Sequence, residues 1–393
     1  MRKILYILVC AMFSFSSCKR NVNIREIAVS DSLFQVIVID PNDINRKEPF
    51  KISTIVEKIE YVPLQTADTV LMGKMNKLIV WNDQFYIWDQ LTEAIFCFNS
   101  KGQFLHKIHK QGKGPDEYPR IYDFTMDMTT GDIYIYSDMS KTIYAYTEKG
   151  EFIRKMESPF ILSSFGIQGN YTYYYLGRTP NADFYSETFP EQCRYVVMEN
   201  DEFKHEQLKY IFDDKYLQIP SSRNVFSFYK DTMLLVEYLK PEIYSIDSIG
   251  RLRPKYRIEF LTNTYSPSFN EEIDLERMES EKKNGNLTTL FNAFFETDDY
   301  LFFNYARGII GSAYVNKKDR TIHNMGYFLM DDFNQNSLPS VIDFVDENYM
   351  YKSVEPASLI RRQLKGNFSP YLDGMVENMR EFDNPVIIKI KLK

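Results

Sequence analysis

Three short apolar runs separated by polar turns occur twice in close succession, first at 84–107 and again at 132–155. The first stretch reads QFYIWDQLTEAIFCFNSKGQFLHK, and the second reads DIYIYSDMSKTIYAYTEKGEFIRK. The two align without a gap at an offset of 48 residues, which is the spacing from Gly102 to Gly150. Short apolar runs bounded by turn residues are typical of β-strands, so we predict an antiparallel meander in each copy.

The same rhythm continues along most of the chain, although its third and fifth copies are less regular. Gly250 lies 100 residues after Gly150, which is two further periods. A repeat of this length, whose units cannot bury their faces alone, is typical of the blades of a β-propeller. Complete four-stranded units are predicted at about 74–110, 121–156, 160–211, 225–260 and 290–326.

The last unit is one strand short, and a strand near the N-terminus can supply it. Strands are predicted at 340–344 and 348–354, and the chain ends in the alternating run VIIKIKLK at 386–393. The alternating run at 52–64 has no partner in the first unit. Pairing it beside the C-terminal strand would remove two exposed sheet edges. The sequence therefore predicts an all-β, six-bladed β-propeller closed by pairing of its N- and C-terminal strands.

Two segments interrupt the strands and are predicted to be small helical insertions. Residues 270–284 hold too few apolar positions for a buried helix, so we predict a solvated one. Residues 357–380 are predicted to be helical, with Pro370 dividing them. The domain organisation is then a propeller at 51–393, preceded by a tether and N-terminal cap at 18–50 that includes a short strand at 36–39.

The first 17 residues have the features of a secretory signal peptide. A positively charged start, Arg2 and Lys3, precedes an apolar segment, and small residues lie directly before Cys18. Small residues before a cysteine resemble a bacterial lipobox, in which the cysteine becomes acylated and is the first mature residue. We therefore expect a lipid anchor at Cys18, the alternative being ordinary cleavage with Cys18 incidental. Several acyl chains would hold the protein on a membrane.

Composition supports the strand assignment and narrows the partners. Aromatic residues make up 16% of the chain, with 29 Tyr and 30 Phe, and aromatic side chains suit pleated surfaces. The net charge of −7 is spread along the chain without a basic stripe, so a nucleic-acid partner is not expected. Cys97 and Cys193 fall in different units, which leaves a disulfide between them open. No cysteine and histidine spacing predicts a metal site.

Several stretches together resemble one family. They are VEKIEYVPL at 56–64, GKGPDEYPRIYDF at 112–124, the SKG and EKG turns, and NPVIIKIKLK at 384–393. With these the chain resembles the six-bladed β-propeller lipoproteins of Bacteroidetes, relatives of the NHL-repeat propellers. The resemblance implies a fold more than an activity. Since no acidic cluster follows Cys18, we expect an outer-membrane lipoprotein that faces the periplasm, and surface exposure stays open.

Candidate binding residues lie where the connections after second and fourth strands emerge, because these connections share one face of a propeller. Polar groups that converge there are the default ligand site. The guanidinium groups of Arg178 and Arg307 could hold a carboxylate or phosphate, or could be solvated or ion-paired instead. The other candidates have structural alternatives as turn caps or ties between blades. The full set is Asp89, Glu117, Tyr118, Arg120, Asp138, Arg178, Glu237 and Arg307.

Catalytic motifs are absent from the sequence. It holds no GxSxG elbow and no HExxH, so no catalytic residue, metal ligand or cofactor is predicted. We expect a lipid-anchored binding or scaffold module for a peptide, glycan or protein partner. The alternative is an NHL-like lyase or hydrolase with Ca or Zn in its axial channel, which only the analogy of fold supports.

Overall fold

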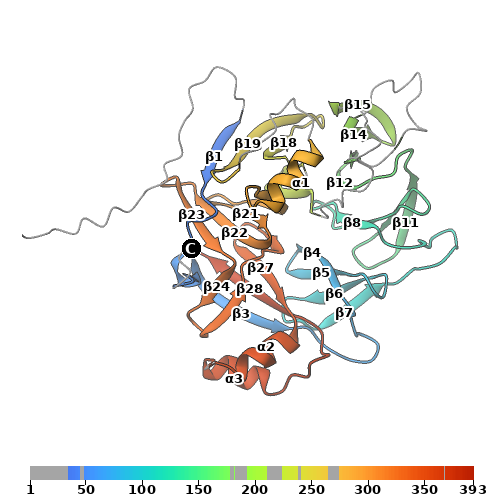
Figure 1. The fold of residues 1–393 in the computed structure, drawn as a ribbon. Helices are drawn as coiled ribbons and strands as arrows, with labels where there is room; N and C mark the ends of the chain where they lie inside the picture. Colours follow the sequence, from blue (N-terminus) through green and yellow to red (C-terminus); the bar gives the residue numbers. More distant parts are fainter. Residues whose placement is uncertain are drawn as a thin grey trace, which may run out of the picture.

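The computed structural model describes residues 34–44, 48–177, 181, 193–209, 224–237, 240–263, 274–366 and 368–393. In these residues the strands form seven β-sheets arranged around the molecule (Figure 1). Six of the sheets hold at least four strands, and the seventh holds three. The all-β propeller fold is therefore confirmed, and the prediction of six blades is wrong.

The duplicated stretch forms the first two sheets, each a meander in chain order. Gly102 adopts a φ of +77°, and a Cβ there would lie 2.2 Å from the carbonyl oxygen of Pro63, so the Lys-Gly turn needs glycine. The strands are β4 (Met75–Trp81), β5 (Gln84–Asp89), β6 (Ala94–Asn99) and β7 (Phe104–Ile108), then β8 (Asp123–Met126), β9 (Ile133–Ser137), β10 (Thr142–Tyr146) and β11 (Phe152–Glu157).

The third, fourth and fifth sheets repeat this order, and the fourth sheet also contains a fifth strand. The short strand predicted at 36–39 is confirmed as β1 (Gln35–Ile39), which pairs parallel to β19 from Gln35 opposite Tyr256 to Ile39 opposite Phe260. The remaining strands are β12 (Ser164–Gln168), β13 (Tyr171–Tyr175), β14 (Cys193–Glu199), β15 (Glu202–Lys209), β16 (Phe226–Tyr229), β17 (Thr232–Val236), β18 (Glu242–Ile246), β19 (Leu252–Phe260), β20 (Thr289–Glu296), β21 (Tyr300–Arg307), β22 (Ile309–Asn316) and β23 (Thr321–Gly326).

The strand predicted near the N-terminus and the C-terminal strand lie in one sheet, as predicted. β28 pairs antiparallel with β3, from Val386 opposite Pro63 to Leu392 opposite Val56. The start of the predicted N-terminal strand is instead a 3-10 helix, η1 (Ile52–Thr54). The sheet consists of β26 (Phe344–Val345), β27 (Tyr349–Val354), β28 (Val386–Leu392) and β3 (Val56–Pro63).

The seventh sheet accounts for the wrong blade count. It consists of β2 (Phe50–Lys51), β24 (Phe328–Asp331) and β25 (Asn336–Pro339). Its strands have two to four residues, too few for alternation to separate them from a connecting loop. Side chains fix the sheet to the N-terminal segment, since the Tyr61 hydroxyl donates to Asp331 at 2.6 Å and the Ser53 hydroxyl donates to Asp332 at 2.6 Å.

The predicted helical insertions are confirmed. α1 (Leu275–Lys283) begins at Asp274, whose carboxylate accepts from the Arg277 backbone N–H, and its described side chains are exposed or half-buried. α2 (Pro356–Gln363) and α3 (Pro370–Val376) bury Leu359 and Leu372 against the closing sheet. Pro370 is the first residue of α3, where its missing N–H costs no hydrogen bond.

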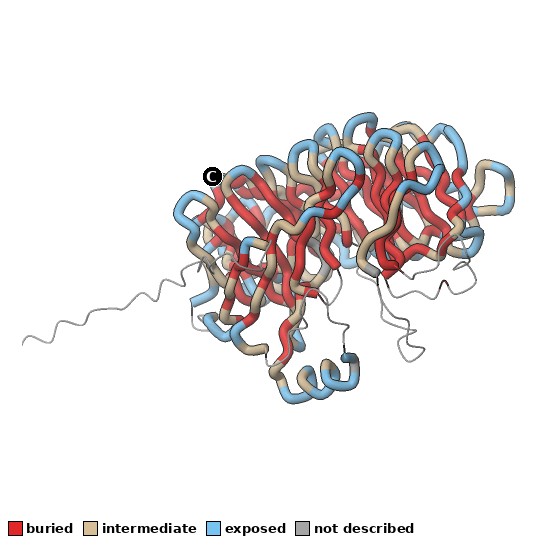
Figure 2. Tube along the Cα trace, turned by 90° about the horizontal axis from the view of Figure 1, so that it is seen from above, coloured by how far each residue is buried: buried red, intermediate tan, exposed pale blue. Residues whose placement is uncertain are grey.

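Neighbouring sheets meet through their first strands. β8 contacts β12, β12 contacts β16, β16 contacts β20, β20 contacts β26, and β26 contacts β4. Polar side chains join three of these strands, because the buried Asp123 carboxylate accepts from the Lys77 ammonium at 2.8 Å and from the Ser164 hydroxyl at 2.7 Å. Figure 2 shows buried strands filling the interior and exposed residues concentrated in the loops at their ends. Side chains that a ligand can reach therefore lie mainly in the loops.

Candidate functional site

A cavity of about 760 Å³ lies between α1, the turn from β21 to β22 and the segment that follows β1. Small-ligand sites commonly have volumes of this size. The cavity lies on the face where connections after second and fourth strands emerge, because α1 follows β19 and the other turn follows β21. Its lining residues are Pro41, Asn42, Glu279, Lys282, Lys283, Gly285, Leu287, Arg307, Gly308 and Tyr327.

Arg307 is fixed in the cavity wall by neutral acceptors. Its Nε and Nη2 donate to the Gly285 carbonyl oxygen at 3.2 and 2.9 Å, and its Nη1 donates to Asn42 Oδ1. No carboxylate forms an ion pair with Arg307 among the residues that the structure describes. The guanidinium is therefore held in one orientation without its charge being compensated by a contacting acid.

Two lysines bring further positive charge to the same cavity. Lys282 and Lys283 occupy the last turn of α1, where cations interact favourably with the helix dipole. Both are exposed, and neither has an ion-pair partner in the described part of the chain. Glu279 is the single acid among the lining residues, against three bases. The cavity therefore favours an anionic ligand.

The apolar part of the wall is anchored in the core. Leu287 is buried, and Tyr327 packs against a hydrophobic cluster that includes Leu290 and Tyr305. Across this wall the Asn324 side-chain amide donates to the Asp40 carbonyl oxygen at 3.1 Å, which fixes the segment after β1. Tyr327 thus offers an aromatic surface beside the three cations.

Asp89 and the Arg120–Asp138 pair lie at turns with their polar groups already used. The buried Asp89 carboxylate accepts from the backbone N–H groups of Gly73 and Lys74 at 2.9 and 2.6 Å, and also from the Thr92 hydroxyl. Arg120 forms a bidentate ion pair with Asp138, and Arg120 Nε lies 2.7 Å from Asp138 Oδ1. These contacts cap a turn at Asp89 and join the linker at Arg120 to the turn that follows β9 of the second sheet.

Glu117 and Tyr118 organise the linker between the first two sheets. The Glu117 carboxylate accepts from the Gly114 N–H at 2.8 Å, and a Cβ at Gly112 would lie 1.9 Å from Glu117 Oε2. The Tyr118 hydroxyl is buried, donates to the Glu93 carbonyl oxygen at 2.9 Å and accepts from the Lys110 N–H. Burial raises the pKa of this phenol. Both side chains therefore serve the local backbone.

Glu237 is buried and forms an ion pair with Arg194, whose Nε lies 2.5 Å from Glu237 Oε2. Arg178 and Cys18 lie outside the described residues. Of the predicted binding residues that the structure describes, only Arg307 lines the cavity, so the set does not converge on this cavity.

Sequence reasoning missed the other lining residues, among them Asn42, Lys282, Lys283 and Tyr327. A usable signal for the lysines was present, because the helix that carries them was predicted after a fourth strand and therefore on the same face as Arg307. No such signal existed for Asn42, which reaches the cavity only because β1 pairs with the distant β19.

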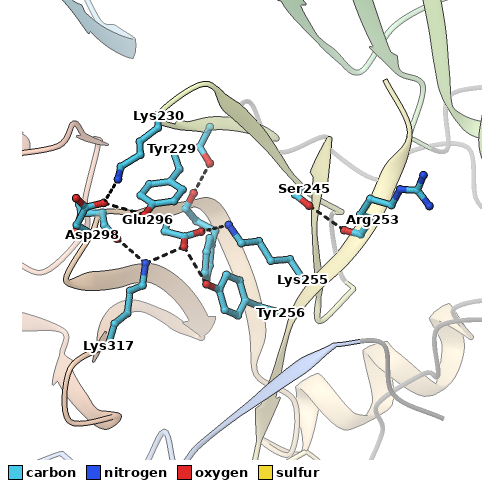
Figure 3. Close-up of polar contacts among 12 residues, drawn as sticks. Tyr229, Lys230, Ser245, Arg253, Lys255, Tyr256, Glu296, Asp298 and Lys317 are labelled. Carbon is cyan, nitrogen blue, oxygen red and sulfur yellow. Dashed lines mark hydrogen bonds and ion pairs between the residues drawn. The ribbon is translucent and has the colours of Figure 1, made fainter. Parts of the chain in front are cut away.

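A second charged cluster lies on the opposite face, at the turns that follow first and third strands (Figure 3). The buried Glu296 carboxylate accepts from Lys255 Nζ at 2.5 Å, from Lys317 Nζ at 3.0 Å and from the Tyr256 hydroxyl at 3.0 Å. The Tyr229 ring lies 5.0 and 4.8 Å from the same two ammonium groups. We call these five residues the Glu296 cluster.

The Glu296 cluster joins the fourth and fifth sheets. Lys255, Tyr256 and Tyr229 belong to the fourth sheet, while Glu296 ends β20 and Lys317 follows β22 of the fifth. The Tyr229 hydroxyl also donates to Asp298 at 2.9 Å, and Lys230 pairs with Asp298 at 2.7 Å. Its acids and bases contact one another directly, so this cluster holds the two sheets together rather than binding a ligand. We call such a compensated cluster a latch.

Three further findings concern other kinds of site. Within the described ranges, no group of three or more His, Cys, Asp or Glu side chains could hold a metal ion. Cys97 and Cys193 are buried and are not joined to each other by a disulfide. None of the helices in the described part of the chain is both long and apolar enough to cross a bilayer.

Comparisons with known proteins place the fold and the family. A Bacteroides fragilis protein described as exported has a solved structure that matches with a TM-score of 0.72 at 17% identity, over 92% of this chain and 99% of that one. A member of the DUF4221 family from Bacteroides vulgatus matches at 0.49 and 14% identity, over 86% and 97%. A catalytically inactive virginiamycin B lyase from Staphylococcus aureus, solved with quinupristin, matches at 0.40 and 13% identity, over 86% and 100%.

The first likeness supports the propeller fold, and the other two, with TM-scores below 0.5, carry no argument. No curated protein matches the sequence. Residues 34–391, nearly the whole described chain, match one sequence family. The chain therefore belongs to the family described as a domain of unknown function, DUF4934.

Proposed function

We propose that this chain is a β-propeller of the cell envelope that acts as a binding or scaffold module for a peptide, glycan or protein partner. The cavity around Arg307 carries the proposal. It has the volume of a ligand site, lies on a loop face, and presents three basic residues against one acid. None of these basic side chains forms an ion pair within the described residues, so a ligand can supply the missing negative charge.

The envelope location rests on the N-terminal segment. A signal peptide at 1–17 with acylation of Cys18 would anchor the propeller to the outer membrane, with the periplasmic side favoured. Replacing Cys18 with Ala is expected to abolish incorporation of radiolabelled palmitate and to release the protein from the membrane fraction. Substituting Cys97, which is buried and distant in sequence, is the matched control. Unchanged labelling of the Cys18 variant would contradict the lipid anchor.

The binding role is tested with the full-length protein and a mixed array of glycans and peptides. Any retained compound is then added during hydrogen–deuterium exchange. We expect protection in α1 and in the turn from β21 to β22, and no chemical change in the compound. Protection confined to other loops, or turnover of the compound, would overturn the proposal. No observation on the described residues favours the alternative, a metal-assisted lyase or hydrolase.

A further inference from the structure

We infer that the cavity around Arg307 takes a small acidic saccharide and binds its carboxylate groups. This inference rests on the proposed function and names the class of ligand. Three properties of the cavity support it: its cations, the other groups of its wall, and its volume.

The cations come from two elements that meet at the cavity. Arg307 ends β21, and Lys282 and Lys283 lie in the last turn of α1, which ends two residues before the Gly285 carbonyl that Arg307 contacts. Three cations facing one acid exceed what a single carboxylate needs. They suit a ligand that carries more than one carboxylate, as an oligosaccharide of uronic acids does.

Arg307 has a fixed orientation and spare donors. The Gly285 carbonyl oxygen and Asn42 Oδ1 together use one N–H of each guanidinium nitrogen. An arginine offers five N–H donors, so its two terminal nitrogens each keep one N–H for a ligand. A carboxylate can be bound there without the entropy loss of first ordering the side chain.

The rest of the wall suits a sugar ring. Tyr327 supplies an aromatic ring held against the core, and Asn42 supplies an amide. An amphipathic ring beside polar groups can contact the apolar face of a saccharide while its hydroxyls reach donors and acceptors. The volume of about 760 Å³ exceeds what a lone anion needs and lies within the range of small-ligand sites.

The test measures affinities of the full-length protein by calorimetry at low and at physiological salt. The probes are a trisaccharide of galacturonic acid, the neutral trisaccharide of galactose, a tripeptide of Glu and inorganic phosphate. We expect the acidic trisaccharide to bind most tightly and its affinity to fall as salt rises, because exposed charges are screened. The neutral trisaccharide should bind at least about tenfold more weakly, as the loss of charged hydrogen bonds implies.

Variants locate the binding. Arg307→Ala should weaken the acidic trisaccharide about tenfold or more. Because Arg307 also holds Gly285 and Asn42, the charge reversals Lys282→Glu and Lys283→Glu serve as independent variants at exposed positions. Each should reduce the affinity without loss of folding. Lys318→Ala, at an exposed lysine on the opposite face, is the matched control and should leave the affinity unchanged.

Three other outcomes would overturn the acidic ligand, the saccharide or the binding role itself. Equal binding of the neutral trisaccharide, with no effect of the charge reversals, would overturn the acidic ligand while exchange protection at the cavity still supported the binding role. Tighter binding of the peptide, or of phosphate alone, would overturn the saccharide. If no compound on the array and no probe protected the cavity walls, the inference and the proposed function would both fall.

Discussion

The fourth and fifth sheets carry positively charged side chains at both of their ends, and the two ends differ in what those charges contact. In the Glu296 cluster, Lys255 and Lys317 both reach one buried carboxylate. In the Arg307 cavity, the guanidinium contacts only neutral oxygens. Direct compensation makes the first end a latch, and its absence makes the second end a candidate site. The distinction depends on the contacting partner rather than on the number of basic residues.

The largest expected effect comes from removing the acid that makes the first end a latch. Glu296→Ala leaves Lys255 and Lys317, both three-quarters buried, without their shared carboxylate. Breaking a buried ion pair costs several kcal/mol, and partial exposure of the lysines reduces this, so we expect about 2 to 3 kcal/mol of lost stability. Urea unfolding followed by tryptophan fluorescence measures it. A loss no larger than that of an exposed control, Lys318→Ala, would mean that the cluster is not a latch.

Another buried carboxylate, that of Glu242, tests whether an ion pair with one base is enough to offset the cost of burying the charge. Glu242 in β18 is 1% exposed and forms an ion pair with Arg257, yet burial raises its pKa from 4.5 to about 6. The folded state therefore binds a proton more tightly than the unfolded state, so this residue costs stability as the pH rises from 4.5 to 6. A shift of this size corresponds to about 2 kcal/mol.

The measurement compares the wild type with Glu242→Gln, which cannot ionise. The free energy of unfolding of the wild type should fall by about 2 kcal/mol relative to the variant as the pH rises from about 3 to about 7, and the difference should be constant above that. Glu296→Gln measured over the same range serves as the comparison at the other carboxylate. Parallel pH profiles for wild type and Glu242→Gln would show that Arg257 fully offsets the burial.

A smaller effect on ligand affinity is expected from a change that alters the orientation of the Arg307 guanidinium but not the charge of the cavity. Asn42→Ala removes one neutral hydrogen bond to the guanidinium and leaves every charge in place. A net contribution of about 0.7 kcal/mol is typical of such a bond, so the affinity for the acidic trisaccharide should fall about threefold. The slope of affinity against salt should stay unchanged, since no charge is lost. A changed slope would show that Asn42 alters the electrostatics rather than the placement of Arg307.

Some features of the fold and of the candidate site could be predicted from the sequence, and others could not. Strand runs with clear alternation, such as those of β3 and β28, predicted the shared closing sheet because each run is long enough to display its period. The two-to-four-residue strands β2, β24 and β25 show no period, so the seventh sheet was missed. Arg307 was predicted from topology, since it ends a second strand.

The partners of these residues could not be predicted in the same way. Lys255 and Lys317 lie 41 and 21 residues from Glu296 in sequence, and Asn42 lies 265 residues from Arg307. Each contact exists only because whole sheets pack or because β1 adds to β19. Such contacts carry no local pattern, so which charges are compensated, and therefore which end is a site, becomes visible only in three dimensions.

The smallest effect is expected at the exposed margin of the Glu296 cluster. Asp298 pairs with Lys230 at 2.7 Å and accepts from the Tyr229 hydroxyl, but more than half of the Lys230 and Asp298 side chains is exposed. Exposed ion pairs gain little because water screens them and both side chains must be ordered. Asp298→Asn should therefore leave the urea midpoint unchanged, in contrast to Glu296→Gln at the neighbouring buried acid. If Asp298→Asn destabilised the fold as much as Glu296→Gln does, burial of the contacting acid could not be what distinguishes a latch from an ordinary surface pair.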